Sequence, residues 1–292
     1  MKRLTIPILI ILMFLFSGCG KNIPGATPTE TAPAAIPATP TSLPMALRVN
    51  GEGILLSEYE AELTRLQQAQ TTLGQVTTPE EQRNRVIQNF TDQLLLAQAA
   101  TQAGFGVDDA TIQARIDKLV SDIGGIDKLT TWQSANGYTD ESFRAALKRA
   151  ILTTWQRDQI INSVPTTAVQ IHARQILVQD EANASAAYSQ LQSGLDFATL
   201  AFAYDPILGG DLGWFPVGML TQPEVEAAAF AVQPGEYTEV VKSKIGYHIV
   251  FVIERDPAHT LSIDARRALQ EKTLVEWLDA SRAVSNIEVL VP

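Results

Sequence analysis

The chain of 292 residues has one cysteine, three histidines and few basic residues, and each scarcity excludes a class of protein. A single thiol, Cys19, cannot form an intramolecular disulfide, which excludes a disulfide-stabilised scaffold. The histidines stand far apart and show no spacing typical of a metal site, so we expect no metal. With 22 lysines and arginines against 32 acidic residues and no basic stripe, nucleic acid is a poor partner.

Long apolar runs are also scarce, and the clear case lies at residues 4–16. This run follows two basic residues and is too short to span a bilayer comfortably, which is typical of a signal peptide, here residues 1–18. The serine and glycine directly before Cys19 resemble a bacterial lipobox, although Phe16 is not a favoured lipobox residue. We therefore expect Cys19 to carry lipid that anchors the chain to a membrane. An ordinary secreted protein or an uncleaved anchor is the alternative.

The next segment, residues 19–45, is rich in proline, threonine and alanine. Six of the fifteen prolines lie at residues 20–44, where little could form a core. Such a composition favours extended polyproline-like chain. We expect a disordered tether.

From about residue 47 to residue 163 the pattern is helical. Thr-Pro-Glu-Glu at residues 78–81 combines an N-cap threonine, a first-turn proline and a glutamate at the third position, and predicts a helix that ends at Gly104. Ser57 and Glu60 resemble a capping box and predict an earlier helix. Two more helices are predicted, from residues 108–109 to the glycines at 124–125 and from residue 139 onward.

Around residue 165 the apolar period changes, and strand patterns begin. Strands are predicted at VQIHARQILV, LGWF, YTEVV and YHIVFVIE, and helices at ASAAYSQLQSG, DFATLAFAY and PEVEAAAFA. A last helix is predicted from Ser262 to about Ala283, followed by the extended piece IEVLV. We expect this tail to pack back onto the first helices, so that one domain is inserted within the other.

Residues 166–257 resemble the parvulin-type peptidyl-prolyl isomerases through ARQILV, SGLDFATLA, GGDLGWFPVGM and EAAAFAVQPGEYTEVVKSKIGYHIVFV, in that order. VNGEGILLSEYEAEL, at residues 49–63, resembles the start of the helical chaperone domain of exported foldases. Together with the signal peptide, these segments resemble extracytoplasmic lipoprotein foldases of the PrsA and SurA kind. The resemblance implies an α+β fold. In it, a parvulin-like four-stranded antiparallel sheet with flanking helices is inserted in an all-α chaperone domain, residues 46–165, completed by a helix within 258–292.

The reaction of that family is rotation about an X-Pro amide, whose uncatalysed barrier is about 18–20 kcal/mol. No covalent bond changes, so the catalyst needs an apolar socket for proline and a few hydrogen-bonding groups that favour the twisted amide. We expect no cofactor. Carried over by position, the resemblance assigns substrate binding to Leu212, Phe215, Met219 and Val225. It assigns catalytic roles beside the reacting amide to Asp205, His248, Gln175 and Ser243.

Two positions and the length of one loop depart from the family pattern. Val225 stands where the family usually has phenylalanine, and Gln175 stands where it has the first of two paired histidines. His172 lies three residues earlier, which on a strand points its side chain to the other face. The loop after Asp205 is about two residues shorter than usual. Without the resemblance, His248 could be a satisfied core histidine and the apolar socket residues could be ordinary core.

Partner chemistry follows from the charges. Residues 166–257 contain four basic and eleven acidic side chains, so a phosphoserine-proline substrate would be repelled. We expect the partners to be unfolded or nascent exported polypeptides with X-Pro bonds, in the extracytoplasmic part of the bacterial cell envelope. The function expected is a membrane-anchored prolyl isomerase and chaperone. The alternatives are a parvulin fold with weak or no catalysis that binds unfolded clients and, less well supported, a structural envelope lipoprotein.

Overall fold

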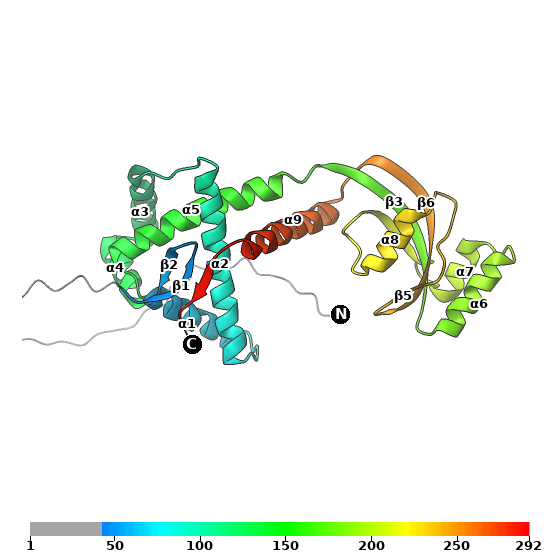
Figure 1. Cartoon of the computed structure of the whole chain (residues 1–292), viewed down its shortest axis with the longest axis horizontal. Helices are drawn as coiled ribbons and strands as arrows, with labels where there is room; N and C mark the ends of the chain where they lie inside the picture. Colours follow the sequence, from blue (N-terminus) through cyan, green and yellow to red (C-terminus); the bar gives the residue numbers. More distant parts are fainter. Residues whose placement is uncertain (1–42, 292) are drawn as a thin grey trace, which may run out of the picture. The chain divides into compact units, whose positions relative to one another are not determined.

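A computed structural model describes residues 43–291 of the chain (Figure 1). The predicted signal peptide, the lipid on Cys19 and nearly all of the predicted tether lie outside the described residues. Within the described range, none of the helices is both long enough and apolar enough to cross a bilayer.

The first half of the described chain is mainly helical. Its helices are α1 (Leu56–Thr72), α2 (Pro79–Gln102), α3 (Asp109–Ile123), α4 (Ile126–Ala135) and α5 (Asp140–Asn162). The capping box predicted for α2 is present, because the Thr78 hydroxyl accepts from the Glu81 backbone N–H at 3.2 Å and the Glu81 carboxylate accepts from the Thr78 N–H at 2.7 Å. Thr139 and Ser142 form a capping box at α5, and the Asp108 carboxylate caps α3 by accepting from the Thr111 N–H.

A prediction fails at the start of this part, which is not all-α. Strands β1 (Met45–Val49) and β2 (Glu52–Leu55) form an antiparallel hairpin whose turn residues, Asn50 and Gly51, both have positive φ. Helix α1 follows β2 directly. Ser57 therefore lies inside its first turn instead of capping it, and the N-cap residue, Leu55, makes no side-chain cap.

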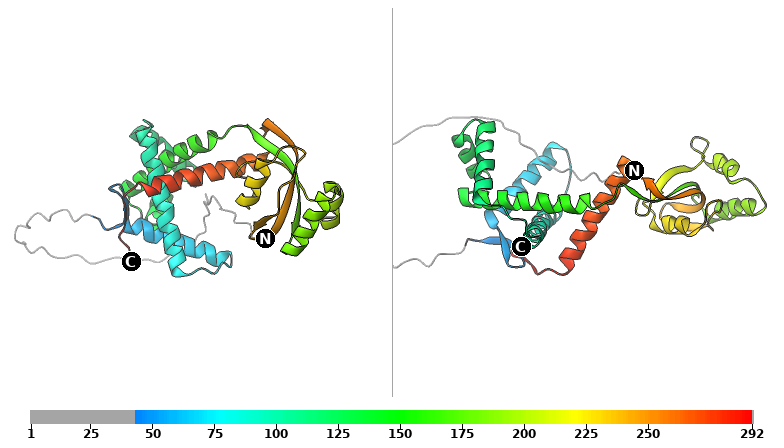
Figure 2. Two further views of the ribbon diagram at one scale, coloured as in Figure 1. Left: turned by 45° about the vertical axis from the view of Figure 1, so that its right-hand side comes forward. Right: turned by 90° about the horizontal axis from the view of Figure 1, so that it is seen from above.

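The end of the chain completes this part. Helix α9 (Ile263–Ala283), capped by Ser262, contacts α5 and α2, and strand β7 (Ile287–Val289) pairs antiparallel with β1 to give the order β2-β1-β7 (Figures 1 and 2). Leu278 of α9 is buried against Leu96 of α2 and Ile160 of α5. The tail thus returns to the first helices, as the apolar pattern predicts.

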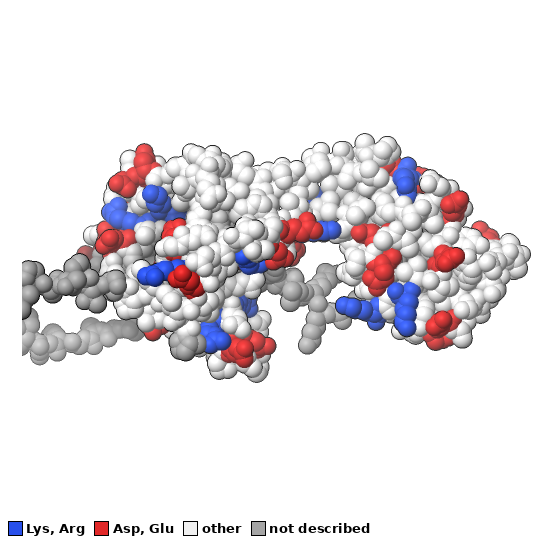
Figure 3. All heavy atoms as spheres, in the orientation of Figure 1, with Lys and Arg blue, Asp and Glu red and all other residues white. Residues whose placement is uncertain are grey.

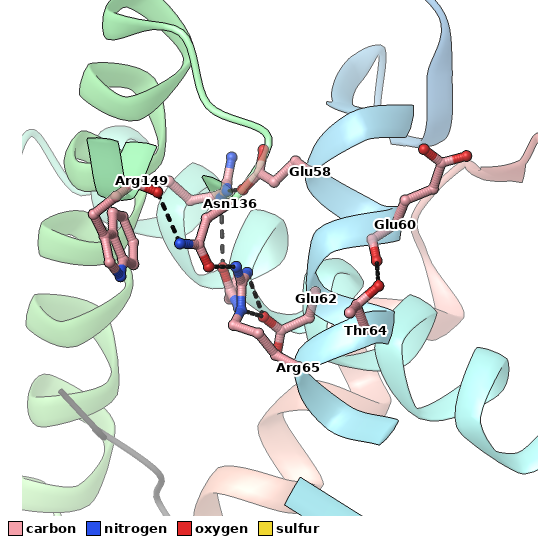
Figure 4. A network of polar contacts seen from close by, with 9 residues as sticks. Glu58, Glu60, Glu62, Thr64, Arg65, Asn136 and Arg149 are labelled. Atoms are coloured by element: carbon pink, nitrogen blue, oxygen red, sulfur yellow. Dashed lines mark hydrogen bonds and ion pairs between the residues drawn. The ribbon is translucent and has the colours of Figure 1, made fainter. Parts of the chain in front are cut away.

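A buried ion pair joins three helices of this part (Figure 4). Glu58 of α1 and Arg149 of α5 form it with side chains only 5% and 9% exposed, and Arg149 also donates to the Gln93 amide oxygen of α2 at 3.3 Å. Arg65 of α1 bridges Glu62 and Asn136, at 2.7 and 3.0 Å. Burial raises the pKa of the Glu58 carboxyl above its ordinary 4.5, although the Arg149 guanidinium acts in the opposite direction.

Residues 167–260 form a second sheet. Strands β3 (Thr167–Val178), β4 (Asp211–Pro216), β5 (Val241–Ser243) and β6 (Gly246–Thr260) are antiparallel in the order β4-β3-β6-β5. Helices α6 (Glu181–Gln192) and α7 (Phe197–Tyr204) connect β3 to β4, and α8 (Pro223–Ala231) precedes β5. The strand predicted at YTEVV is shorter than expected, since before Val241 only Tyr237 bridges to β6.

The two faces of this sheet carry separate apolar cores. Ile176 and Ile249 pack with α6 and α7 on one face. Ile171, Ala173 and Val250 pack on the other face with residues of β4 and α8. The α+β fold with a four-stranded antiparallel sheet is therefore confirmed, and α8 covers the face on which the predicted site residues lie.

Candidate active site

The polar residues of the predicted site lie on the two central strands. Along β3, Gln175 follows Ala173 at the two-residue spacing of one sheet face, and along β6, His248 precedes Val250 in the same way. Both side chains therefore share the α8 face with the second core. The structure brings them together, because His248 Nδ1 lies 2.9 Å from Gln175 Oε1.

His248 is held at both ring nitrogens. Gln175 Oε1 can only accept, so Nδ1 carries the proton, and Nε2 of the neutral ring accepts from the Ser243 hydroxyl at 2.8 Å. Ser243 in turn accepts from the Ile245 backbone N–H at 3.1 Å. His248 is 2% exposed, and burial lowers its pKa below 6.5, although the Glu224 carboxylate acts in the opposite direction. The Ser243–His248–Gln175 chain is accordingly neutral near pH 7.

The apolar site residues belong to one cluster but differ in exposure. Phe215 and Val225 are 1% and 2% exposed and lie within the core, whereas Leu212 and Met219 are half-buried and pack against it. The first pair forms a packed floor. Only the second pair offers apolar surface to a molecule arriving from solvent.

Two glycines in the segment at residues 209–219, Gly210 and Gly213, determine where its backbone turns. Gly210 has φ +68°, and a Cβ there would lie 1.8 Å from the carbonyl oxygen of Gln175, so no side chain fits. Gly213 has φ +67° and belongs to a β-bulge. In this bulge, Gly213 and Asp211 pair with adjacent residues of β3, namely Ala173 and Arg174. Leu212 is the extra residue of this bulge, and the bulge changes the direction in which the Leu212 side chain points.

The carboxylate of Asp205, at the C-terminus of α7, is hydrogen-bonded to the backbone of its own loop. Its carboxylate accepts backbone N–H groups from Ile207 and Leu208 at 3.2 Å and from Gly210 at 3.0 Å. These bonds, the one from Gly210 above all, lower the pKa of Asp205 below 3.8. Gly210 O accepts from the Gln175 N–H at 2.8 Å, so Asp205 acts on the site through the backbone and makes no hydrogen bond to His248.

Glu226 of α8 is a site residue that the sequence did not reveal. It is 6% exposed, and its carboxylate accepts the backbone N–H groups of Gly218, Met219 and Leu220 at 2.7, 3.0 and 2.9 Å. It therefore holds the loop that carries Met219. In the sequence, Glu226 is an acidic residue between Val225 and three alanines in a short predicted helix. This pattern could have drawn attention to Glu226, but the sequence alone does not indicate that its side chain is buried.

His172 lies on the opposite face of the sheet. Its Nε2 is 2.9 Å from the Asp211 carboxylate, and its ring stacks on Trp214, which in turn stacks on His259 at 4.2 Å between centroids. Asp211 also accepts from the Gly213 N–H, which stabilises the turn. His172 thus does not replace the family histidine whose position Gln175 occupies.

On the face of the described residues in Figure 3, acidic and basic side chains are interspersed, without an extended basic area.

Two family models match the chain. The model described as the SurA-like N-terminal domain matches residues 3–157, and the PPIC-type PPIase domain matches residues 163–268. The first covers more than half of the 292 residues. The parvulin and foldase resemblance drawn from the sequence is confirmed.

The chain is also similar to individual proteins over part of its length. A foldase protein PrsA from Caldanaerobacter subterraneus is 29% identical over 221 residues, which cover 69% of this chain and 71% of that protein. A chaperone SurA from Methylobacillus flagellatus is 28% identical over 212 residues, or 59% of this chain and 47% of that protein. The crystal structure of the peptidylprolyl isomerase PrsA from Bacillus anthracis has a TM-score of 0.40 at 26% identity, over 65% of this chain and 94% of that one.

The chain thus spans 71% of the first relative and about half of the second. The matches divide it as the sheet and helices do, with the helical part first and the four-stranded sheet second. The chain belongs to the family with a SurA-like N-terminal domain, and its second domain is a PPIC-type peptidyl-prolyl cis-trans isomerase domain.

Proposed function

We propose that the chain is a membrane-anchored foldase of the bacterial cell envelope. In this proposal, the isomerase domain is residues 166–257, and the chaperone domain is residues 46–165 together with residues 258–292. Lipid on Cys19, after a signal peptide of residues 1–18 and before a tether that ends at residue 45, provides the anchor. The clients are unfolded exported polypeptides with X-Pro bonds.

The observation that carries this proposal is the neutral hydrogen-bonded chain Ser243–His248–Gln175 on the same sheet face as Leu212 and Met219. Leu212 and Met219 hold the proline ring, with Phe215 and Val225 beneath them. The Gln175 amide N–H₂ makes no hydrogen bond within the described residues, and it donates to the carbonyl oxygen of the client's amide. His248 orients the Gln175 amide, Ser243 orients His248, and Asp205 positions the backbone of Gln175 through Gly210.

A prolyl-isomerisation assay on short peptides, scanning the residue before proline, tests the proposal. Spontaneous isomerisation takes tens of seconds at 25 °C, so catalysis is readily separated from background. We expect His248→Ala to lower kcat/KM by at least tenfold and His172→Ala, on the opposite face, to leave it within twofold. Rates for the unaltered protein that match the spontaneous rate with every peptide would exclude an isomerase.

A second candidate function is a client-binding module in which catalysis is weak. It is favoured by Gln175 in place of histidine, by Val225 in place of phenylalanine, and by the Asp205 carboxylate, whose oxygens are engaged by the loop. An aggregation-suppression assay separates the two. Protection of an unfolded client by a protein that does not accelerate isomerisation supports the binding module, and equal rates for Asp205→Ala and the unaltered protein show that Asp205 is not catalytic.

A further inference from the structure

Strand β7 has an open outer edge. Asn286 O accepts from Asn50 N–H and Leu290 N–H donates to Ala46 O, each at 2.8 Å, so the backbones of alternate residues face β1. The backbones of Ile287, Val289 and Val291 therefore point away from β1. No strand among the described residues pairs with that side, since the sheet order is β2-β1-β7.

The open edge borders a groove of about 540 Å³ between β7 and α2. The side chains of Ile287, Val289 and Val291 line one wall, and Ile87 of α2 lies on the other. Val289 is 48% exposed although it is apolar. Glu288, the charged residue of β7, alternates with these apolar residues and does not line the groove. Native proteins usually protect sheet edges with charge, proline or a covering element, so a sheet edge whose groove side is apolar is suited to accept another strand.

The charged side chains of the groove have one sign. Arg83 and Arg282 line it and no acidic residue does, in a chain whose net charge is −10. Arg282 is already paired with Asp92 and Asp279. Among residues 43–291, Arg83 has no ion-pair partner, and its Nε is buried without a hydrogen-bond partner. A buried donor of this kind is stabilised by an acceptor brought by a bound molecule.

We propose that this groove binds one extended segment of an unfolded polypeptide as an additional strand on β7. The segment has apolar side chains at alternate positions, which face Ile87 and Val289, and an acidic side chain that reaches Arg83. This inference rests on the proposed function in that unfolded chains are the clients, but it concerns a surface remote in sequence from the isomerase residues. A second copy of the protein fits less well, because pairing two identical edges would bring like-charged grooves together.

Backbone-modified peptides test strand addition without changing the protein. The probe is a fluorescent, proline-free peptide in which threonine alternates with valine or isoleucine and one apolar position is glutamate. Fluorescence anisotropy with the full chain measures its affinity. N-methylation at alternate residues removes the N–H groups of one strand edge, and methylation at the other residues removes those of the other edge. We expect one set to weaken binding at least tenfold and the other to leave it within threefold, whereas equal affinities overturn the proposal.

Protein variants locate the site. Val289→Pro removes an outward N–H and weakens binding at least tenfold, while Val289→Thr, which keeps the N–H and the branched shape, changes it less than threefold. Replacing the peptide's glutamate by glutamine weakens binding several-fold, and this difference disappears in Arg83→Gln. Peptide binding that is unchanged in both Val289→Pro and Arg83→Gln overturns the proposal.

Two further results would also overturn it. One is a dimer of the unaltered protein that dissociates in Val289→Pro, which would make a second copy the occupant. The other is much tighter peptide binding by a chain that starts at residue 43, which would make the chain's own first residues the occupant. Isomerisation measured in the same samples keeps the two proposals apart, because an active isomerase without edge binding contradicts only the strand-addition site.

Discussion

Two polar clusters, one in each part of the chain, differ in charge and in burial. Glu58 and Arg149 in the helical part form an ion pair, whereas Gln175, His248 and Ser243 in the isomerase domain form a neutral chain. The ion pair is buried on both sides, with side chains 5% and 9% exposed, whereas in the neutral chain only His248 is buried and Gln175 and Ser243 are partly exposed. An ion pair must recover the desolvation cost of two charges through its own geometry, while a neutral chain needs only matched donors and acceptors.

This difference fits what each cluster has to do. The ion pair links α1 to α5 and, through Gln93, to α2, so it selects one packing of three helices. In the proposed function, the neutral chain faces a client amide that is itself neutral, and an ionised histidine beneath that amide would bind water more strongly than the client. We infer that buried charge specifies the fold of the helical part and that buried neutral polarity serves chemistry in the isomerase domain.

The largest effect is expected from Arg149→Leu. Removing the guanidinium leaves Glu58 buried without a countercharge, which should cost about 3–5 kcal/mol of the free energy of unfolding. Urea denaturation followed by circular dichroism measures this loss. Lys118→Ala, in an exposed pair with Asp122, serves as the control and should cost no more than about 0.5 kcal/mol. If Glu58→Leu combined with Arg149→Leu is as unstable as Arg149→Leu alone, the uncompensated charge is not the cause.

Glu226→Ala should come next. It leaves the backbone N–H groups of Gly218, Met219 and Leu220 without their acceptor, and we expect a loss of about 2–3 kcal/mol in stability. Because the loop carries Met219, kcat/KM should fall about tenfold through a higher KM. Glu224→Ala, on the exposed side of the same helix, is the matched control. An unchanged KM in Glu226→Ala would mean that Met219 does not hold proline.

The two parts should respond to pH in opposite directions. His248 has a folded pKa below 6.5, so its stabilising contribution is present above pH 6.5 and is lost as the pH falls toward the folded pKa. Glu58 has a folded pKa above 4.5, so its contribution is present below pH 4.5 and is lost as the pH rises through the folded pKa. Single-tryptophan variants that keep Trp214 or Trp155 report on each part separately during denaturation.

Between pH 7 and 5 we expect the free energy of unfolding of the isomerase domain to fall. Because at most one proton is taken up by His248, the fall should not exceed about 1.4 kcal/mol per pH unit. His248→Gln should abolish this trend, and Glu58→Gln should weaken the opposite trend in the helical part, to which Asp92 also contributes because burial raises its pKa above 3.8. Parallel trends in both parts would contradict the contrast between charged and neutral clusters.

The smallest effect is expected from Gln175→His, which restores the residue usual in the family. The hydrogen bond to His248 is kept in either case, so kcat/KM should rise less than about threefold, or about 0.7 kcal/mol in activation free energy. Gln175→Leu, which removes the acceptor for Nδ1, is the contrasting variant and should lower both activity and stability. A rise of tenfold or more in Gln175→His would show that a titrating pair of histidines is needed.

The helices could be predicted from the sequence because their ends carry local chemistry. Thr78, Asp108, Thr139 and Ser262 each cap a helix with a bond to a residue three positions later, which a short stretch of sequence contains. Hairpin β1–β2 was missed although Asn50-Gly51 is a strong turn signal. The pairing of β7 with β1 joins residues some 240 positions apart, and no local pattern indicates it.

The site could be predicted only in part. The resemblance located Gln175 and His248 on adjacent strands, and the structure joins them by a hydrogen bond. Burial was not predictable: Phe215 and Val225, which the resemblance assigns to substrate binding, are 1% and 2% exposed and lie within the core. The role of Glu226 depends on three backbone groups of a folded loop, which the sequence does not display.

The entry and exit of the inserted domain lie one strand apart. Thr167 pairs with Thr260, and Leu261 N–H donates to Thr166 O at 2.9 Å. A short turn could therefore join Thr166 to Leu261 without moving either end of the host. Evolution could add, exchange or duplicate the catalytic module at this junction while the host fold stayed intact. A chain of residues 46–165 joined to 258–292 should then fold alone, which makes the junction a place for grafting other enzymes onto the same helical scaffold.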